Sequence, residues 1–472
     1  MTKTDALPQD RVPCAPPTVL VIGLGIAGLT AAIECHRKGC KVIGFEKKRG
    51  ATQPGDIIGL SGNSVRVLSQ WSPEFSQFAD EEITCAVEAL EFYDPAGNLH
   101  VSMPYNPASP TQGYMFRRTG LLEKLYEQAI RDGIELRYGV NVTGYWEDVG
   151  SAGVYIGDSN HNIVADCVIA ADGFHSTARK VFTSEKDALQ RDEFIGAIAY
   201  RAIFDARETT HLPEAQWLLD KAPAADVFRS FFGNDFMFVT GTAARGRYIH
   251  WACALRGEQA EQTSQAWVQP ASAEPVLDRA RTWPSPTGSK LAAVISATPP
   301  DACFSHALLA KPPLRTWVSP KGRMVVIGDA AHPILPYAGQ GANQAIEDAA
   351  VIAICLERAG PKRIPLALRV FEKLREHQRS NHIMPNLHAR HERVSLIQAG
   401  SIEAEDAYLK ANWEGGDETK KPSGYLQQPW VYEHDCVAHA QAEFDIAVEA
   451  IETGRKYIPT NVPMDGKYRS EQ

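Results

Sequence analysis

TVLVIGLGIAG, at residues 18–28, indicates the architecture of this 472-residue chain more clearly than any other segment. Its β-branched run, 18–22, predicts a short buried strand. A helix is predicted over 29–38, ended by Gly39, and a second strand over 41–46. Strand, glycine-rich turn, helix and strand within about 30 residues make a βαβ unit, whose two strands must be parallel.

The turn between strand and helix has the pattern G-x-G-x-x-G. Gly23 permits the tight turn, Gly25 lets a pyrophosphate approach the backbone, and Gly28 lets the helix pack closely on the strand. Glu46 ends the second strand, where a carboxylate accepts hydrogen bonds from ribose hydroxyls and repels a 2′-phosphate. This context predicts a site for the ADP half of FAD or NAD. The alternative is a purely structural turn with a surface glutamate.

Composition excludes several classes of protein. Lys and Arg number 48 and Asp and Glu 57, for a net charge of −9, which argues against a nucleic-acid binder. No apolar run reaches the ~18–20 residues needed to cross a bilayer, and the polar start is no secretory signal. The nine cysteines include no C-x-x-C pair and are expected to be reduced thiols. We expect a soluble, cytoplasmic protein that contacts neither nucleic acid nor membrane.

The residue pattern changes from about Phe194 to Leu255, where aromatic and β-branched runs alternate with turn residues. This predicts a largely antiparallel sheet. The predicted fold class is α/β, with a Rossmann-like dinucleotide-binding domain interleaved with a mostly antiparallel β-sheet domain and followed by a C-terminal helical region. The expected boundaries are 1–17 for a flexible extension, 18–190 and 300–385 for the two parts of the nucleotide domain, 191–299 for the sheet domain, and 386–472 for the helical region.

Two further motifs follow predicted strands. AADGFHSTAR, at 170–179, comes after the apolar run 164–171, and IGDAAHP, at 327–333, comes after the run 324–327. The second motif continues as GQGAN at 339–343 and IEDA at 346–349. With the glycine turn, these fingerprints resemble the class A FAD-dependent monooxygenases, the salicylate- and p-hydroxybenzoate-hydroxylase-like family, in its fungal secondary-metabolism type. The resemblance runs from about Thr18 to Asp435.

The resemblance implies a bound FAD and a set of residues around it. Asp329 would accept hydrogen bonds from the ribityl hydroxyls, and Gly341 and Ala342 would bring a helix N-terminus to the flavin's pyrimidine edge. Arg118 would serve the pyrophosphate side, and Asp172 would serve both FAD and the nicotinamide cofactor. For the two aspartates, helix capping is the alternative. Gly59 resembles the segment that passes the flavin, and 430–435 resembles the family's late aromatic-to-Asp stretch.

The implied reaction uses NADPH or NADH and O₂. Hydride reduces FAD, and a C4a-hydroperoxyflavin passes one oxygen atom to an electron-rich aromatic or polycyclic substrate. Arg201 is the candidate for stabilising a phenolate; alternation places it opposite Tyr200, and the alternative is a solvated surface arginine. His332 and Pro336 fall in the loop beside the flavin, where we favour His332 as a residue that orients the loop over an acid–base role.

One segment departs from the family pattern. FMFVTG, at 236–241, lacks the Tyr-Pro pair often found on the strand across the pocket, so we expect a more apolar pocket that suits a polyketide, indole or terpenoid. Ring hydroxylation, epoxidation and ring insertion stay open, as do a flavin dehydrogenase or reductase and a flavin-binding scaffold. A halogenase is disfavoured because its W-x-W-x-I-P motif is missing. No metal site is expected, since His388 and His391 lack further ligands, and the protein would be a monomer or homodimer.

Overall fold

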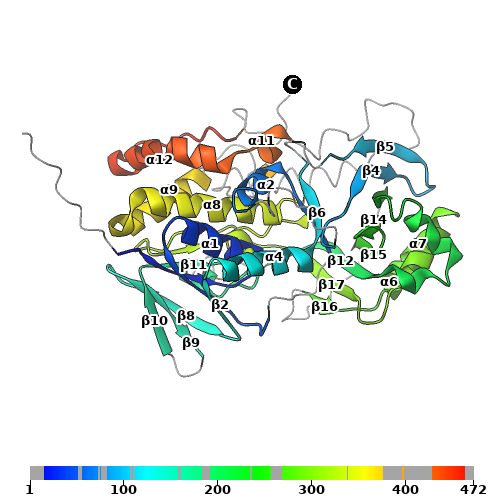
Figure 1. Cartoon of the computed structure of the whole chain (residues 1–472), viewed down its shortest axis with the longest axis horizontal. Coiled ribbons are helices and arrows are strands. Elements are labelled where there is room, and N and C mark those ends of the chain that lie inside the picture. Colours follow the sequence, from blue (N-terminus) through cyan, green and yellow to red (C-terminus); the bar gives the residue numbers. More distant parts are fainter. Residues whose placement is uncertain are drawn as a thin grey trace, which may run out of the picture.

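The computed structural model describes most of the chain in two connected parts, a parallel-sheet part and a broad antiparallel sheet (Figure 1). Among these residues, no helix is both long and apolar enough to cross a bilayer. Residues 1–14 of the expected extension, and His388 and His391, lie outside the described set. The described residues are 15–50, 56–72, 75, 82–106, 109, 112–157, 161–182, 192–233, 236–256, 268–336, 339–375, 396–397 and 428–462.

A five-stranded parallel sheet forms the centre of the first part, in the order β18-β11-β1-β2-β7. The predicted βαβ unit is confirmed, with β1 paired parallel to β2. Strand β1 is buried from Val19 onward because helices cover one face of the sheet and a three-stranded sheet covers the other (Figure 1). The strands are β1 (Thr18–Ile22), β2 (Lys41–Glu46), β7 (Glu135–Tyr138), β11 (Cys167–Ala170) and β18 (Met324–Val326), with β8 (Val142–Glu147), β9 (Ala152–Ile156) and β10 (His161–Ala165) in the covering sheet.

The apolar run at 164–171, predicted as one strand, is divided in the structure. Its first residues end β10 and its later ones form β11, with Asp166 at the bend between them. The Asp166 carboxylate accepts a hydrogen bond from the backbone N–H of Thr18 at 2.8 Å. A polar side chain inside the run therefore separates two strands that belong to different sheets.

Helix α8 is the central helix of this part, and α1, α9 and α12 pack against it (Figure 1). The C-terminal helix α12 thus extends the layer of helices over the parallel sheet. It begins where the Asp435 carboxylate accepts from the backbone N–H of Ala438 at 2.9 Å, an N-cap. The helices are α1 (Ile26–Arg37), α2 (Gly62–Leu68), α4 (Arg118–Arg131), α5 (Arg179–Phe182), α8 (Gly341–Ala359), α9 (Ile364–Arg375), α11 (Pro429–Tyr432) and α12 (Cys436–Thr453).

The second part is an eight-stranded sheet in the order β16-β17-β12-β15-β14-β13-β4-β5. All its pairs are antiparallel except β13 with β4, which confirms the prediction of a largely antiparallel sheet. It is wider than the span 191–299, because β4, β5 and β17 join it from either side in sequence. Its strands are β4 (Val87–Tyr93), β5 (Leu99–Pro104), β12 (Glu193–Asp205), β13 (Asp226–Phe232), β14 (Phe236–Ala243), β15 (Tyr248–Arg256), β16 (Gln269–Pro270) and β17 (Cys303–Ala310).

The two faces of this sheet have different neighbours. One face, with Tyr200 and Trp251, packs on α6 (Glu274–Arg281) and α7 (Thr287–Ser296) to make a second hydrophobic core. The other face carries Arg201 and meets segments of the nucleotide-binding part, including the pair β3 (Ile57–Leu60) and β6 (Tyr114–Arg117). Tyr200 and Arg201 thus lie on opposite faces, as strand alternation predicts.

Candidate functional site

The glycine-rich turn after β1 has the geometry that phosphate binding requires. Gly23 has φ +89°, and a Cβ there would lie 2.5 Å from the carbonyl oxygen of Ala171. A Cβ on Gly28 would lie 1.8 Å from the carbonyl oxygen of Gly23, whereas one on Gly25 would meet nothing within 4 Å. Gly23 and Gly28 therefore permit close packing, and Gly25 borders open space at the N-terminus of α1, where a pyrophosphate would sit.

The three fingerprint turns lie side by side at the carboxyl edge of the parallel sheet. The first turn touches the second at Gly23 and Ala171. Arg179, in the second motif, donates hydrogen bonds to the carbonyls of Ala330 and Ala331 in the third, at 2.9 and 3.1 Å. Strands that are neighbours in a parallel sheet end at the same edge, so segments far apart in sequence make one continuous surface.

Two other glycines predicted to contact the cofactor, Gly59 and Gly341, also border open space, as does Gly173 of the second motif. A Cβ built on Gly59, Gly173 or Gly341 would meet nothing within 4 Å. Gly59 lies on β3, and its carbonyl accepts from the Asn343 side chain of α8 at 3.1 Å. Gly341 begins α8, followed by the half-buried Ala342. Bare backbone therefore borders open space where β3 meets the N-terminus of α8, a place that suits the flavin end of a dinucleotide.

Glu46 is buried at the end of β2, and both of its carboxylate oxygens have partners. One accepts from the backbone N–H of Leu24 at 2.9 Å and the other from that of Lys48 at 3.0 Å. The side chain therefore holds the glycine turn in place. Each oxygen keeps a second lone pair, so the predicted bond to a ribose hydroxyl fits this arrangement.

The two predicted aspartates differ in their surroundings. Asp172 Oδ2 accepts from the backbone N–H of Thr177 at 2.9 Å and from the hydroxyl of Tyr145 at 3.2 Å. These bonds fix the loop after β11, whereas the first residue of α5, Arg179, donates its backbone N–H to Ser176 Oγ at 3.2 Å. The side chain of Asp329, on the 3₁₀ turn at 328–330, is accessible to solvent. The protein atoms crowded around its carboxyl group nevertheless reduce the solvation of that group, and this raises the pKa of Asp329. Accessible surface with a desolvated carboxyl is the combination shown by a residue that lines a concave surface, so Asp329 fits the ribityl role.

Charged residues gather where the two parts of the protein meet. Arg201, on β12, forms an ion pair with Asp56 at 3.6 Å, with only 17% and 19% of the two side chains exposed. The backbone N–H of Arg118 donates to the Asp56 carbonyl at 2.8 Å. Burial, then the charge of Arg201, lowers the pKa of Arg118, while Asp56 and Asp329 oppose the shift. The structure thus brings the predicted residues Arg118, Arg201 and Asp329 into one electrostatic neighbourhood.

His332 points into the protein, away from the open surface. Its Nε2 lies 2.6 Å from Asp348 Oδ2 of α8, and its ring packs on Trp317 at 5.0 Å between centroids. The same Asp348 oxygen accepts from the backbone N–H of Gly328 at 3.0 Å. Asp348 therefore holds both ends of the loop that presents Asp329, and this supports the loop-orienting role predicted for His332.

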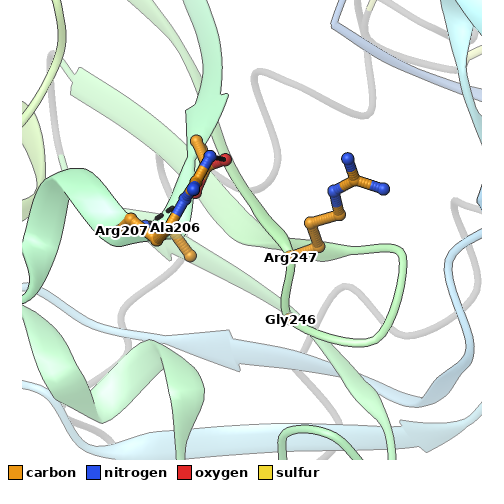
Figure 2. A pocket seen from close by; sticks show the side chains of 5 residues that line it. Ala206, Arg207, Gly246 and Arg247 are labelled. Carbon is orange, nitrogen blue, oxygen red and sulfur yellow. Dashed lines mark hydrogen bonds and ion pairs between the residues drawn. The ribbon is translucent and has the colours of Figure 1, made fainter.

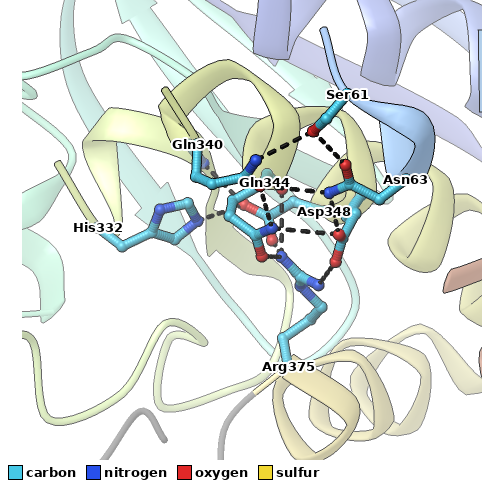
Figure 3. A network of polar contacts seen from close by, with 9 residues as sticks. Ser61, Asn63, His332, Gln340, Gln344, Asp348 and Arg375 are labelled. Carbon is cyan, nitrogen blue, oxygen red and sulfur yellow. Dashed lines mark hydrogen bonds and ion pairs between the residues drawn. The ribbon is translucent and has the colours of Figure 1, made fainter. Parts of the chain in front are cut away.

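A buried polar network surrounds Asp348, as Figure 3 shows. Arg375, the last residue of α9, donates to Asp348 at 2.7 Å and to Glu347. Asn63 of α2 donates to Glu347 at 2.6 Å. None of the three charged side chains is more than 1% exposed. Through this network α8 connects α2 and α9 with the segments predicted to hold the flavin.

Pro336 lies in the segment between His332 and the start of α8 and is exposed. The neighbouring Leu335 is buried against Ala197, Ala254 and Leu308 on the sheet. The loop therefore spans from the α8 network to the face that carries Arg201. The Pro336 carbonyl accepts a hydrogen bond from the backbone N–H of Gly339 at 2.9 Å, a turn contact that assigns the residue no chemical role.

Sequence reasoning did not find Asp56, Asn343, Arg179 or Arg375 as residues of this site. Asn343 and Arg179 lay inside the quoted motifs, but their bonds join segments that only the folded chain brings together. Asp56 lies three positions before Gly59, and no local pattern distinguishes it.

Two surface hollows lie elsewhere on the described part of the chain. One, of about 290 Å³, is lined by Arg207 and Arg247 near the end of β12 (Figure 2). Both arginines are paired with carboxylates, Arg207 with Asp205 and Arg247 with Glu82. The other, of about 270 Å³, lies beside the start of β2. Neither contains a predicted site residue, and the described residues include no cluster of three or more potential metal ligands.

Comparison with known proteins identifies the family. The family described as FAD binding domain matches residues 17–287 and 309–359. Notoamide E oxidase notB′ of Aspergillus versicolor is 53% identical over 475 residues, covering 100% of this chain and 99% of the relative. FAD-dependent monooxygenase notI of Aspergillus sp. strain MF297-2 is 41% identical over 447 residues, covering 95% and 96%.

A solved structure gives the same result. The crystal structure of CtdE in complex with FAD and a substrate matches with a TM-score of 0.83 and 34% identity, over 92% of this chain and 100% of that one. The predicted fold class and the resemblance to FAD-dependent monooxygenases are both confirmed. This chain belongs to the FAD-binding-domain family and is an FAD-dependent monooxygenase of the kind found in fungal secondary metabolism.

Proposed function

We propose that this enzyme uses NADPH or NADH and O₂ to add one oxygen atom to a neutral, polycyclic, electron-rich natural product. Bound FAD would supply the redox chemistry, taking hydride from the nicotinamide and transferring oxygen. Gly25, Glu46 and Arg118 would hold its nucleotide half, and Asp329 its ribityl chain. The protein's own task is then to bind the substrate, orient it and exclude water.

The observation that carries this proposal is the sheet face around Arg201. Register pairs Arg201 with Ala252, and Ala252 with Val239, so these side chains share one face. Met237 and Phe304 lie on the same face by the same pairing. All five are half-buried, whereas the opposite face forms a closed core. Segments of the nucleotide-binding part border this apolar strip on two sides, through Asp56 and Leu335.

The charges near this face favour an uncharged substrate. Arg201 is already paired with Asp56. The negative charges of Asp56 and Asp329 both act on Arg118 and raise its pKa against the effect of burial. Burial, reinforced by Arg201, lowers the pKa of His306 to about 3, so this imidazole adds no positive charge at neutral pH. A substrate carboxylate would find no uncompensated cation among these groups. A neutral ring system would bury its surface on the apolar strip instead.

Arg201 and Asp56 have a specific role in this proposal. The guanidinium donates hydrogen bonds toward a substrate oxygen or nitrogen as negative charge develops there. Asp56 keeps the guanidinium oriented and neutralised until the substrate arrives. The name of the relative notoamide E oxidase suggests notoamide E as a first probe for this pocket.

The test is a turnover assay with purified, FAD-loaded enzyme. NADPH and NADH oxidation and O₂ consumption are measured with notoamide E and with salicylate, and product masses are recorded. We expect stimulation by notoamide E and a product heavier by one oxygen atom. Nicotinamide oxidation that yields a product without added oxygen would instead identify a dehydrogenase or reductase. Oxygenation of salicylate alone would contradict the neutral-substrate argument.

Variants of Arg201 test the site itself. Arg201→Met should lower the rate of oxygenation by about 100-fold or more, by the loss of one oriented charged donor, while the dissociation constant of FAD stays within about threefold. Arg207→Met is the matched control, because Arg207 follows the same strand and its side chain is 85% exposed. Equal turnover in both variants would remove Arg201 from the pocket.

A further inference from the structure

Three buried thiols lie together at the amino-terminal edge of the parallel sheet, away from the edge that carries the flavin turns. Cys35 lies in the last turns of α1, Cys40 immediately precedes β2, and Cys167 begins β11. The thiols of Cys35 and Cys40 are hydrogen-bonded to each other, and the backbone N–H of Cys40 donates to the Cys35 carbonyl at 3.0 Å. This is a pair of thiols in contact, outside the flavin site.

The pair is open to small molecules on one side. Cys40 lines the surface hollow of about 270 Å³ together with Pro17, Lys38, Gly39 and Glu357. It is 5% exposed, whereas Cys35 is 0% exposed. Cys40 is therefore the thiol that a reagent in the hollow meets first, and Cys35 lies behind it.

The pKa values of the two thiols also make Cys40, the more exposed of the two, the more reactive one. The hydrogen bond from Cys35 lowers the pKa of Cys40, although burial and Glu357 oppose the shift. The same hydrogen bond, with burial, raises the pKa of Cys35 well above its usual range. Because the thiolate is the reactive form, Cys40 is the better nucleophile and Cys35 remains a neutral thiol beside it.

We propose that Cys40 and Cys35 are a peroxide-reactive dithiol in which Cys40 is oxidised first and Cys35 closes a disulfide. The Cys40 thiolate attacks one oxygen of hydrogen peroxide; the O–O bond breaks, a sulfenic acid forms, and hydroxide leaves and takes up a proton as water. Cys35 sulfur then attacks the Cys40 sulfur, the S–O bond breaks, and a second water leaves with the Cys35 proton. Two thiols are oxidised to one disulfide, and one peroxide is reduced to two waters.

Cys167 is the competing partner. Its charge influences the pKa of Cys35, and that of Cys40 influences its own. Cys167 is fully buried in the sheet and does not line the hollow. Cys35, in direct contact with Cys40, is therefore the resolving thiol in this proposal. The disulfide would join the end of α1 to the start of β2 and close the loop at 36–39.

The full-length, FAD-loaded protein is reduced, treated with hydrogen peroxide, blocked with an alkylating agent under denaturing conditions and digested with trypsin. Cleavage after Arg37, Lys38 and Lys41 separates Cys35 and Cys40 into peptides 12–37 and 39–41. We expect these two peptides to be recovered disulfide-linked, with an intact mass lower by two hydrogen atoms. Cys40 should lose alkylation at least about tenfold faster than Cys303, a buried cysteine of the sheet.

Cysteine-to-alanine variants identify which two thiols form the disulfide. Cys35→Ala and Cys40→Ala should each abolish the linked pair. Cys14→Ala should keep it, which matters because peptide 12–37 also contains Cys14, and Cys303→Ala should keep it too. Recovery of 39–41 unlinked after peroxide, or linked to the peptide that contains Cys167, would overturn the proposal. The wild-type digest alone can give either result, so a variant that fails to fold does not leave the question open.

Discussion

Replacing Arg375 with methionine tests whether the buried network behind the flavin segments stabilises the fold through its charges. The guanidinium lies between Asp348, at 2.7 Å, and Glu347, and it also donates to the Gln344 side chain at 3.0 Å. Methionine has a similar stem and no charge, so it leaves two carboxylates buried without their cation. Removing one partner of a fully buried ion pair lowers the free energy of unfolding by about 3–5 kcal/mol.

The size of the thermal shift follows from the length of the chain. At about 2.1 cal/mol/K per residue, a chain of 472 residues has an unfolding entropy of roughly 1 kcal/mol/K if it melts as one unit. The expected loss is therefore about 3–5 °C in melting temperature, measured by calorimetry on the FAD-loaded protein. The triple variant Arg375→Met, Glu347→Gln, Asp348→Asn should recover most of this loss, because it removes the uncompensated charges.

The pH dependence of the stability loss separates this electrostatic effect from a general packing defect, because a packing defect would not depend on pH. In the wild type, burial would raise the pKa of Asp348, but His332 and Arg375 outweigh it and hold the pKa low. The stabilisation of the fold by the Asp348 carboxylate is thus present at neutral pH and is lost as the pH falls through the folded pKa of Asp348. Loss of Arg375 removes one of the charges that hold this pKa low, so the folded pKa of Asp348 is higher in the variant than in the wild type. The stability deficit relative to wild type is therefore largest at neutral pH and shrinks as pH falls. A deficit that is unchanged between pH 8 and pH 5, or below 1 °C throughout, would refute this reasoning.

Two further predictions concern the cofactor surface. Gly25→Val places a side chain where nothing lies within 4 Å, at a backbone conformation of φ −79° and ψ −166° that valine accepts; the FAD-free protein should melt within about 1 °C of wild type, while the dissociation constant of FAD, measured by flavin fluorescence, rises at least about tenfold. Asp329→Asn removes a charged acceptor, so the same titration should show a dissociation constant about 10- to 100-fold higher. Unchanged affinity in either variant would contradict the corresponding assignment.

Local patterns predicted the nucleotide-binding elements well. Thr18–Ile22 and Lys41–Glu46 are strands with the predicted bounds, because short runs rich in β-branched residues beside a glycine turn leave few alternatives. The alternation of aromatic and β-branched runs with turn residues over 194–255 predicted the antiparallel sheet equally well. In each case the signal lies within a few consecutive residues.

Contacts between distant segments could not be read in the same way. The ion pair of Arg201 with Asp56 depends on how β12 meets the residues before β3. The pairing of β13 with β4 brings in a strand from well before the expected sheet domain. Asp348 lay inside a quoted motif, but its bond to the Gly328 backbone exists only once α8 has packed beneath the loop. Such interactions follow from tertiary packing, which no periodicity encodes.

The interlocking of α8 with its neighbours has a consequence for how enzymes of this kind diversify. Asn343, Glu347 and Asp348 connect this one helix to β3, to α2 and to the turn after β18. A substitution at any of them therefore disturbs a segment that another of them also helps to hold. The sheet face with Met237 and Val239 meets the nucleotide-binding part through Leu335, through the Arg201–Asp56 pair and through apolar contacts of β3 and β6. In the proposed pocket, exchanging single side chains such as Met237 or Val239 would therefore change which molecules fit while the network around α8 stays in place.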